Sequence, residues 1–223
     1  MAAVRRLKRE VGRILSGLRR EFPTPECALR HESPFQLLIA TILSAQCTDE
    51  RVNKVTQTLF AKYPTVADLA ALPLKSLEKE IQSTGFFRNK ARNIKACCAQ
   101  LVARHGGQVP HTMEELVQLP GVGRKTANVV LGTAFGIASG VVVDTHVSRI
   151  SQRLGLTKEK TPEKIERDLM AVLPESEWIG FSHRVIYHGR RTCKALRPLC
   201  ESCGLADDCP RIGVKPHQPR QVT

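Results

Sequence analysis

Two ionisable residues near the middle of the chain are candidates for chemistry. Lys125 directly follows LPGVGR (119–124), in which two glycines flank a valine, and Asp144 lies within VVVDTHVSR (141–149). An unprotonated lysine amine is a nucleophile that forms Schiff bases. A fixed carboxylate can stabilise positive charge that develops in a transition state. A helix and a loop between the two residues could bring both groups into one pocket.

The glycine segment before Lys125 resembles an anion-binding hairpin. Gly121 and Gly123 lack a Cβ, so a tight turn here would expose backbone N–H groups at the start of the next helix. The positive end of the helix dipole would add to this anion site. A glycine turn that only packs two helices is the alternative. The adjacent Arg124 and Lys125 favour binding of a nucleic-acid phosphate, which would fix register without reading sequence.

Each candidate also has a simpler role. By position alone, Lys125 is better explained as a counter-charge for a phosphate, although a helix start and partial burial would both disfavour its ammonium form. Asp144 is a good N-cap for the helix that begins at THVSR. The capping and catalytic roles of Asp144 are compatible, because a capping carboxylate accepts backbone hydrogen bonds and stays anionic.

Four cysteines are concentrated in one segment near the end of the chain. Cys193, Cys200, Cys203 and Cys209 follow the pattern C-x6-C-x2-C-x5-C. Four thiolates this close can bind one compact centre, either zinc or an iron–sulfur cluster. Zinc modules usually pair two C-x2-C knuckles, and only one is present here. The residues alone leave the choice between these two centres open.

The charge balance indicates a polyanionic partner. The chain has 223 residues, a net charge of +13 and a pI of about 9.7. Residues 5–20 carry seven Arg or Lys against one acid, and Arg190, Arg191, Lys194 and Arg197 form a second group. A generically basic surface is the alternative. Nucleic acid is the leading partner class and an anionic membrane surface the second, although no apolar run is long enough to cross a membrane.

The remaining cysteines and the first residues bear on location. Cys27, Cys47, Cys97 and Cys98 are expected to be buried thiols in a reducing cytosol. Residues 1–22 are Arg-rich and amphipathic, which also suits a mitochondrial transit peptide. Their apolar residues form one helical face that runs without a break into the chain, so we favour an integral helix.

Periodicity and capping residues predict an all-α protein of about ten helices. Ser33, Thr48 or Asp49, Thr112, Asp144 and Thr161 are candidate N-caps, Thr112 within a capping box with Glu115. The expected helices cover residues 34–45, 49–63, 65–72, 74–85, 89–107, 112–119, 124–135, 144–155, 161–174 and 176–189. The tail 212–223 is expected to be flexible.

LPGVGRKTA followed by VVVDTHVSR resembles the helix-hairpin-helix and Gly/Pro-Asp motif of the base-excision DNA glycosylases, and is most similar to the bifunctional endonuclease III branch. LLIATILSAQCTD and the cysteine pattern match that branch too. The resemblance spans nearly the whole chain. It implies a six-helix domain over 27–137 and an iron–sulfur domain formed by 1–26 and 138–211, with the catalytic cleft between them.

The resemblance also assigns roles. It implies that Lys125 is the nucleophile, that Asp144 stabilises charge or helps move protons, and that the four cysteines hold a 4Fe–4S cluster. Lys194 and Arg197, between the first two cysteines, would face DNA phosphates. A solvated basic loop is the alternative for these two residues.

Enzymes that act on a base must extrude it from the duplex and fill the gap. In the family, Gln46 corresponds to the gap-filling residue, Phe86 or Phe87 to the wedge, Arg88 to a contact with the opposite strand, and His146 to a residue near the lesion. The alternatives are a capping glutamine, two core phenylalanines and an exposed histidine.

The sequence therefore predicts a monomeric, cytoplasmic, nucleoid-associated base-excision enzyme that acts on damaged double-stranded DNA. It would remove oxidised pyrimidines through a lysine Schiff base and cleave the strand by β-elimination. A monofunctional glycosylase and a non-catalytic iron–sulfur DNA-binding protein are the rival functions.

Overall fold

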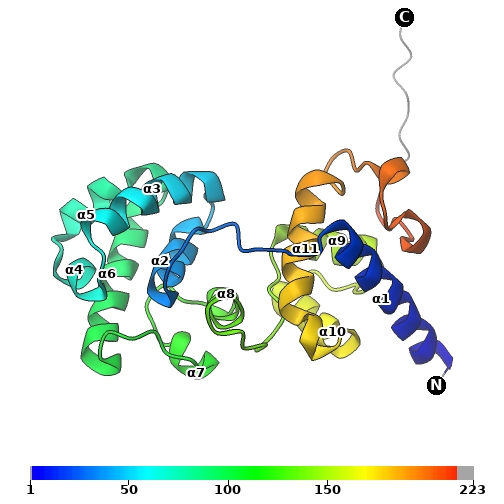
Figure 1. The fold of residues 1–223 in the computed structure, drawn as a ribbon, viewed down its shortest axis with the longest axis horizontal. Helices are drawn as coiled ribbons and strands as arrows, with labels where there is room; N and C mark the ends of the chain where they lie inside the picture. Colours follow the sequence, from blue (N-terminus) through cyan, green and yellow to red (C-terminus); the bar gives the residue numbers. More distant parts are fainter. Residues whose placement is uncertain (1, 215–223) are drawn as a thin grey trace, which may run out of the picture. The chain divides into compact units, whose positions relative to one another are not determined.

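The computed structural model describes residues 2–214, which form eleven α-helices, short 3-10 turns and no strand (Figure 1). This confirms the predicted all-α fold class. The chain divides into two compact units. We call Cys27–Ser139 the hairpin unit, and Met1–Glu26 with Gly140–Thr223 the cysteine unit. No helix among the described residues has the length and hydropathy needed to span a bilayer.

The hairpin unit is built around α2, whose side chains are almost all buried. Ser33 caps α2 by accepting a hydrogen bond from the Gln36 N–H, and Pro34 occupies the first helical position. Helices α3, α6 and α8 pack against α2, while α4 and α5 pack along α6 (Figure 1). The helices are α2 (Pro34–Ser44), α3 (Asp49–Lys62), α4 (Val66–Ala71), α5 (Leu74–Glu80), α6 (Phe87–His105), α7 (Met113–Leu116) and α8 (Arg124–Phe135), with a 3-10 turn η1 (Gln82–Thr84) before α6.

The cysteine unit has its own apolar core. Helix α1 packs against α10 and α11, and its buried face confirms that it is an integral part of this core. The elements are α1 (Ala2–Glu21), α9 (Thr145–Arg153), α10 (Pro162–Val172) and α11 (Trp178–Arg191), with the 3-10 turns η2 (Glu175–Glu177), η3 (Cys200–Ser202) and η4 (Ala206–Asp208). Of the four clustered cysteines, Cys193 follows α11, Cys200 begins η3, Cys203 follows η3 and Cys209 follows η4.

Helix boundaries differ from the prediction at several places, among them the end of α5 and the start of α6. The helix expected over 74–85 ends at Glu80, and a 3-10 turn follows because the Thr84 N–H and hydroxyl both donate to the Ile81 carbonyl. Helix α6 begins at Phe87 rather than Asn89. Thr161 lies at the predicted N-cap of α10 but accepts no capping hydrogen bond. Propensity alone did not identify these local hydrogen bonds.

Two further expectations need correction or restriction. Cys97 and Cys98 are fully buried, as predicted, but Cys27 and Cys47 are only half-buried because they lie outside the helices at the edge of the core. In the tail expected to be flexible, the Ile212 N–H donates to the Arg153 carbonyl at 3.1 Å. The rest of that tail, from residue 215, lies outside the described residues.

Candidate functional site

The turn between α7 and α8 packs against the core through its apolar residues, whereas its glycines are exposed. Leu119 and Val122 are buried, and the Val122 N–H donates to the Leu119 carbonyl at 3.0 Å. Gly121 has φ +79°, and a Cβ there would lie 2.8 Å from the Cβ of Asn93. Both the backbone conformation and the close approach of α6 therefore require glycine at position 121.

Gly123 is a glycine for a different reason. Its backbone is extended, with φ −92° and ψ 175°, and a Cβ would meet nothing within 4 Å. Gly123 therefore does not use the positive φ that glycine allows. Gly123 is the N-cap of α8 and provides no side-chain cap. The open space above it leaves the N–H groups at the start of α8 accessible to an anion.

Lys125 is the second residue of α8, as predicted, but its side chain is exposed. The partial burial expected from the sequence is therefore wrong for Lys125. Arg124 is exposed beside it.

Asp144 is the N-cap of α9, as predicted. Its Oδ1 accepts hydrogen bonds from the N–H groups of His146 and Val147, each at 2.8 Å. The side chain is half-buried. Two backbone donors hold the carboxylate in one orientation at the start of a helix, where an anion is favoured. Asp144 therefore presents a carboxylate that two backbone hydrogen bonds hold in place.

His146 is packed rather than exposed. A Cβ on Gly189 of α11 would lie 2.5 Å from the His146 Nδ1, so the ring rests directly on that glycine. The Arg149 guanidinium approaches the same Nδ1 at 3.2 Å and donates to the Cys193 carbonyl at 3.0 Å. Burial lowers the pKa of Arg149, and the neighbouring Arg153 adds to this effect. Arg149 thus connects the helix of Asp144 to the cysteine segment.

Two turns of the hairpin unit carry exposed side chains on strained backbone. Gln46 lies beyond the end of α2 with φ +53°, and Phe86 is the N-cap of α6 with φ +46°. Phe86 is 66% exposed, whereas Phe87 packs against the core and the Arg88 guanidinium lies 5.4 Å from its ring centroid. The alternative of two core phenylalanines is therefore wrong for Phe86. Non-glycine residues in this conformation are uncommon and often functional.

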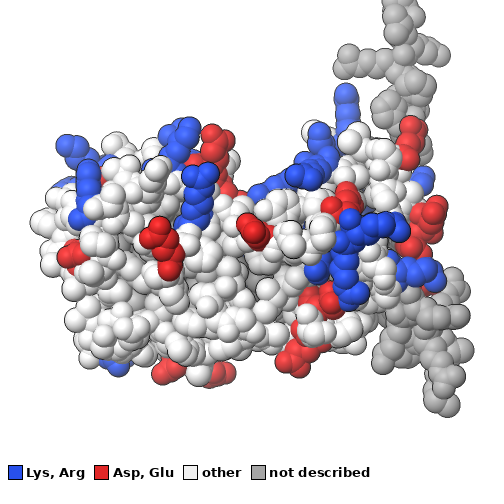
Figure 2. Space-filling model, viewed as in Figure 1, with Lys and Arg blue, Asp and Glu red and all other residues white. Residues whose placement is uncertain are grey.

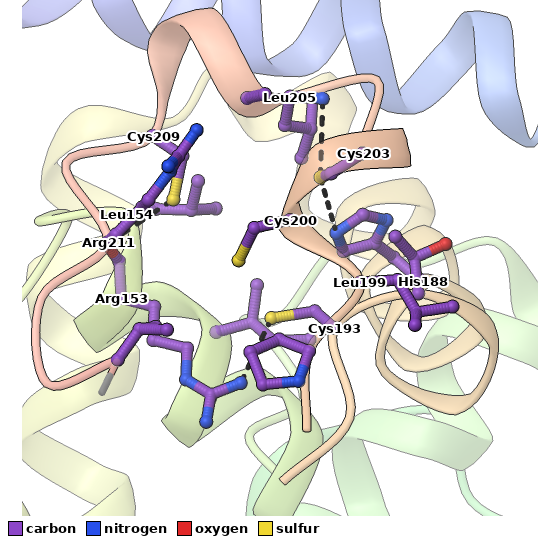
Figure 3. A pocket seen from close by; sticks show the side chains of 15 residues that line it. Arg153, Leu154, His188, Cys193, Leu199, Cys200, Cys203, Leu205, Cys209 and Arg211 are labelled. Atoms are coloured by element: carbon purple, nitrogen blue, oxygen red, sulfur yellow. Dashed lines mark hydrogen bonds between the residues drawn. The ribbon is translucent and has the colours of Figure 1, made fainter. Parts of the chain in front are cut away.

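The four clustered cysteines line one pocket in the cysteine unit (Figure 3). Their sulfurs face a shared space between α9, the end of α11 and the two last 3-10 turns. Leu154, directly after α9, and Leu205 contribute apolar walls. The tertiary structure thus gathers the C-x6-C-x2-C-x5-C pattern around a single centre.

Four cysteines around one pocket can hold either one zinc ion or an iron–sulfur cluster. Zinc bound at about 2.3 Å would draw four sulfurs to about 3.8 Å from one another. Four thiolates are also the usual ligands of a cluster of several irons, so the residues that line the pocket fit either centre.

Hydrogen-bond donors approach two of the sulfurs and favour the thiolate form of Cys193. Arg153 donates to the Cys193 sulfur at 3.2 Å, and the Leu205 N–H donates to the Cys203 sulfur at 3.4 Å. Burial would raise the pKa of Cys193, but the hydrogen bonds from His188 and Arg153 outweigh it and hold the pKa below its usual value. Burial raises the pKa of Cys209.

Three residues at this pocket were not identified from the sequence. Arg153 also donates to the carbonyls of the loop after Cys193, at 2.8 and 2.7 Å. His188 is buried, with Nε2 at 3.7 Å from the Cys203 sulfur and Nδ1 at 2.9 Å from a Glu21 carboxylate oxygen. Glu21 is 167 residues away in sequence, so no local pattern signals this pair. These contacts join residues of α1, α9 and α11, so they form only when the unit folds.

Lys194 and Arg197 are exposed on the loop whose carbonyls Arg153 holds. On the face shown in Figure 2, however, basic and acidic side chains are interspersed on both units. This face therefore does not form a continuous positive surface. The net charge by itself does not locate a DNA-binding surface. The hairpin and this loop are the candidates for such a surface.

The comparisons with known proteins agree with this geometry. A family model described as HhH-GPD superfamily base excision DNA repair protein matches residues 39–175. Endonuclease III of Synechocystis sp. is 56% identical over 91% of this chain and 93% of the relative, and that of Bacillus subtilis is 48% identical over 87% and 88%. The solved structure of a trapped endonuclease III–DNA covalent intermediate is 48% identical, with a TM-score of 0.87 over 92% of this chain and 96% of that one.

Proposed function

The chain belongs to the HhH-GPD superfamily of base excision DNA repair proteins and, within it, to the endonuclease III family, and from this premise we propose which residues perform its reaction. It is a DNA glycosylase with AP lyase activity. We propose that its lesions are oxidised pyrimidines, which stack poorly and therefore cost less to extrude from a duplex.

The observation that carries the assignment is the exposed amine of Lys125 at the uncapped start of α8. In the proposed reaction, the neutral amine attacks C1′ of the deoxynucleotide and the damaged base leaves with the electrons of the glycosidic bond. Loss of a proton from the lysine nitrogen and ring opening give a Schiff base. Removal of a C2′ proton then expels the 3′ phosphate by β-elimination.

Asp144 supplies the fixed carboxylate in this proposal. Its two backbone hydrogen bonds hold Oδ1 in place, so the negative charge is already oriented before substrate binds. A preoriented charge stabilises the positive charge that develops as the glycosidic bond breaks. We also propose that the Asp144 carboxylate assists proton transfer from the nitrogen of Lys125. The reaction requires both side chains to reach the same nucleotide when DNA is bound.

The remaining roles concern DNA contact. We assign phosphate binding to the N–H groups around Gly121 and Gly123, with Arg124 adding charge. Gln46 is proposed to fill the gap left by the extruded base and Phe86, rather than Phe87, to act as the wedge, because Phe86 is exposed. Arg88 is assigned to the opposite strand.

Three further residues complete the proposed contacts. His146, which packs on α11 beside Asp144, is assigned to the vicinity of the lesion. Lys194 and Arg197 are assigned to DNA phosphates, because both are exposed on a loop held by Arg153. The proposed working form is a monomer, and the proposed location is the nucleoid in the cytoplasm.

We propose that Cys193, Cys200, Cys203 and Cys209 hold a 4Fe–4S cluster. The support is the shared pocket, the donors to sulfur and membership of the endonuclease III family. When bound, such a cluster would supply a cross-link that organises the loop carrying Lys194 and Arg197. A purified protein with iron and sulfide and broad visible absorbance would support this assignment, and stoichiometric zinc without iron would contradict it.

Borohydride reduction tests the proposed nucleophile. With duplex DNA that contains an oxidised pyrimidine, the wild-type protein should give a covalent adduct, because borohydride reduces the Schiff base to a stable amine. Lys125→Gln should abolish the adduct. Arg124→Gln is the matched control, since it removes the adjacent exposed cation and should weaken DNA binding without preventing adduct formation.

The outcomes separate the rival functions. Base release without an adduct in the wild type would indicate a monofunctional glycosylase in which Lys125 only binds phosphate. DNA binding without base release would indicate a non-catalytic DNA-binding protein. An adduct that persists in Lys125→Gln would show that another amine is the nucleophile.

A further inference from the structure

Lys90 is a buried cation that the proposed reaction does not use. It lies in the first turns of α6 and is only 5% exposed. Its Nζ donates hydrogen bonds to the carbonyl oxygens of Leu43 and Thr84, each at 2.8 Å. These two oxygens therefore lie no farther apart than twice that length, although their residues belong to different turns of the chain.

The two carbonyls mark the starts of the two strained turns. Leu43 lies in the last turn of α2, three residues before Gln46. Thr84 ends η1, two residues before Phe86. Gln46 and Phe86 both have positive φ, and both are exposed. The Lys90 ammonium thus binds the backbone of both turns, one of which carries the proposed gap-filling Gln46 and the other the proposed wedge Phe86.

We propose that Lys90 is a positioning residue that holds the turns of Gln46 and Phe86 at a fixed separation for extrusion of the damaged base. This inference rests on the proposed function of those two residues. An ammonium suits this role because it donates two hydrogen bonds in different directions from one atom. One of its partners is a carbonyl in the last turn of α2, where the helix dipole also favours a cation.

Burial makes this arrangement specific rather than incidental. An exposed lysine would exchange its carbonyl partners for water at little cost, but a buried ammonium needs its hydrogen bonds. Removing the Lys90 side chain would leave the Leu43 and Thr84 carbonyls without this donor. The two turns would then be free to move relative to each other, and small displacements of positioning groups have large effects on rate.

Lys95 provides a matched control on the same helix. Its Nζ donates to the carbonyls of Ala70 and Leu72, each at 2.7 Å, at the end of α4. It therefore makes the same kind of double contact, but to a turn that carries neither Gln46 nor Phe86. A change at Lys95 tests the effect of losing such a contact on the stability of the hairpin unit alone.

The experiment compares two reactions of full-length variants. One substrate is a duplex with a paired oxidised pyrimidine, whose base must be extruded before release. The other is the same duplex with a preformed abasic site, which has no base pair to break. In Lys90→Met, base release should fall at least about tenfold, while strand cleavage at the abasic site should change less than about threefold. Lys95→Met should leave the ratio of the two rates unchanged.

A fluorescent probe gives an independent readout. With 2-aminopurine opposite the lesion, the rise in fluorescence on binding should be smaller for Lys90→Met than for the wild type and Lys95→Met. If Lys90→Met does not fold, Lys90→Gln takes its place. Its shorter neutral side chain keeps an N–H donor, yet cannot span both carbonyls, and the same change in ratio is expected.

Equal losses in both reactions, or no loss in either, would overturn the role of Lys90 in extrusion. An unchanged ratio in both Lys90 variants would do the same. Failure of the wild-type protein to release the base and to cleave the abasic strand would instead overturn the proposed function. The two failures are therefore distinguishable.

Discussion

Replacing Asp144 by asparagine separates its structural role from its proposed chemical role. The carboxylate Oδ1 accepts two backbone hydrogen bonds at the start of α9. Asparagine is as good an N-cap as aspartate and retains an oxygen in the same position. Asp144→Asn therefore removes the negative charge while it keeps the cap, whereas Asp144→Ala removes both.

The structure sets the expected magnitudes. Asp144→Ala leaves two N–H groups without their 2.8 Å partner, so we expect a loss near the upper end of the N-cap range, about 2 kcal/mol in the free energy of unfolding. For a protein of this size that corresponds to a fall in Tm of about 4–8 °C. Asp144→Asn should change the free energy of unfolding by less than about 0.5 kcal/mol. Loss of the preoriented charge should lower the rate of base release about 10²–10³-fold in both variants.

Thermal unfolding and single-turnover base release measure the two effects separately. Thr65→Ala is a control, because Thr65 caps α4 by accepting from the Asp68 N–H and has no proposed part in the reaction. It should lose about 1 kcal/mol of stability with unchanged base release. DNA binding of Asp144→Asn, measured by fluorescence anisotropy, should remain within about threefold of the wild type, because the lost group contacts no phosphate in the proposal.

Base release by Asp144→Asn within about threefold of the wild-type rate would refute the reasoning, since the carboxylate would then be only a cap. A large fall in Tm for Asp144→Asn would also refute it, because the loss of activity would then follow from loss of the fold.

Three further predictions follow from other parts of the structure. Gly121→Ala should lower Tm, because it places a Cβ at positive φ and against α6. Gly123→Ala should leave Tm unchanged and weaken DNA binding, because the added Cβ obstructs the approach of a phosphate. Thermal unfolding and fluorescence anisotropy measure the two effects, and an equal loss of stability in both variants would contradict this difference. Arg153→Met should reduce the iron and sulfide recovered per chain, because it removes one hydrogen bond to the Cys193 sulfur and two to the loop that follows. Full iron content in this variant would show that these donors are dispensable. Burial raises the pKa values of Cys97 and Cys98 to about 12, so only about one in ten thousand of these thiols is a thiolate in the native protein at pH 8. Both should therefore resist alkylation in the native protein and react after unfolding. Rapid labelling of the native protein at either residue would indicate an exposed thiol.

Short-range patterns were sufficient for the local elements of the site. Asp144 was identified as an N-cap from its place before an amphipathic run, and Ser33 and Thr112 also cap the helices assigned to them. The four cysteines were grouped by spacing alone. Such features depend on residues within one or two turns of each other, so the sequence states them directly.

The environment of each residue was less predictable. The exposure of Lys125, the packing of His146 on Gly189 and the different surroundings of Phe86 and Phe87 depend on which helix lies against each side chain. Gly121 and Gly123 look equivalent in sequence, yet only Gly121 is constrained, because α6 approaches only Gly121.

The sequence by itself determined the all-α class, the hairpin before Lys125, the cap at Asp144 and the set of four cysteines, because each is a local pattern of residue types. Only the tertiary structure decided that Lys90 joins two distant turns and that Glu21 and Arg153 support the cysteine pocket. The physical reason is that a buried polar group takes whichever partners the packing of distant helices brings within hydrogen-bonding distance.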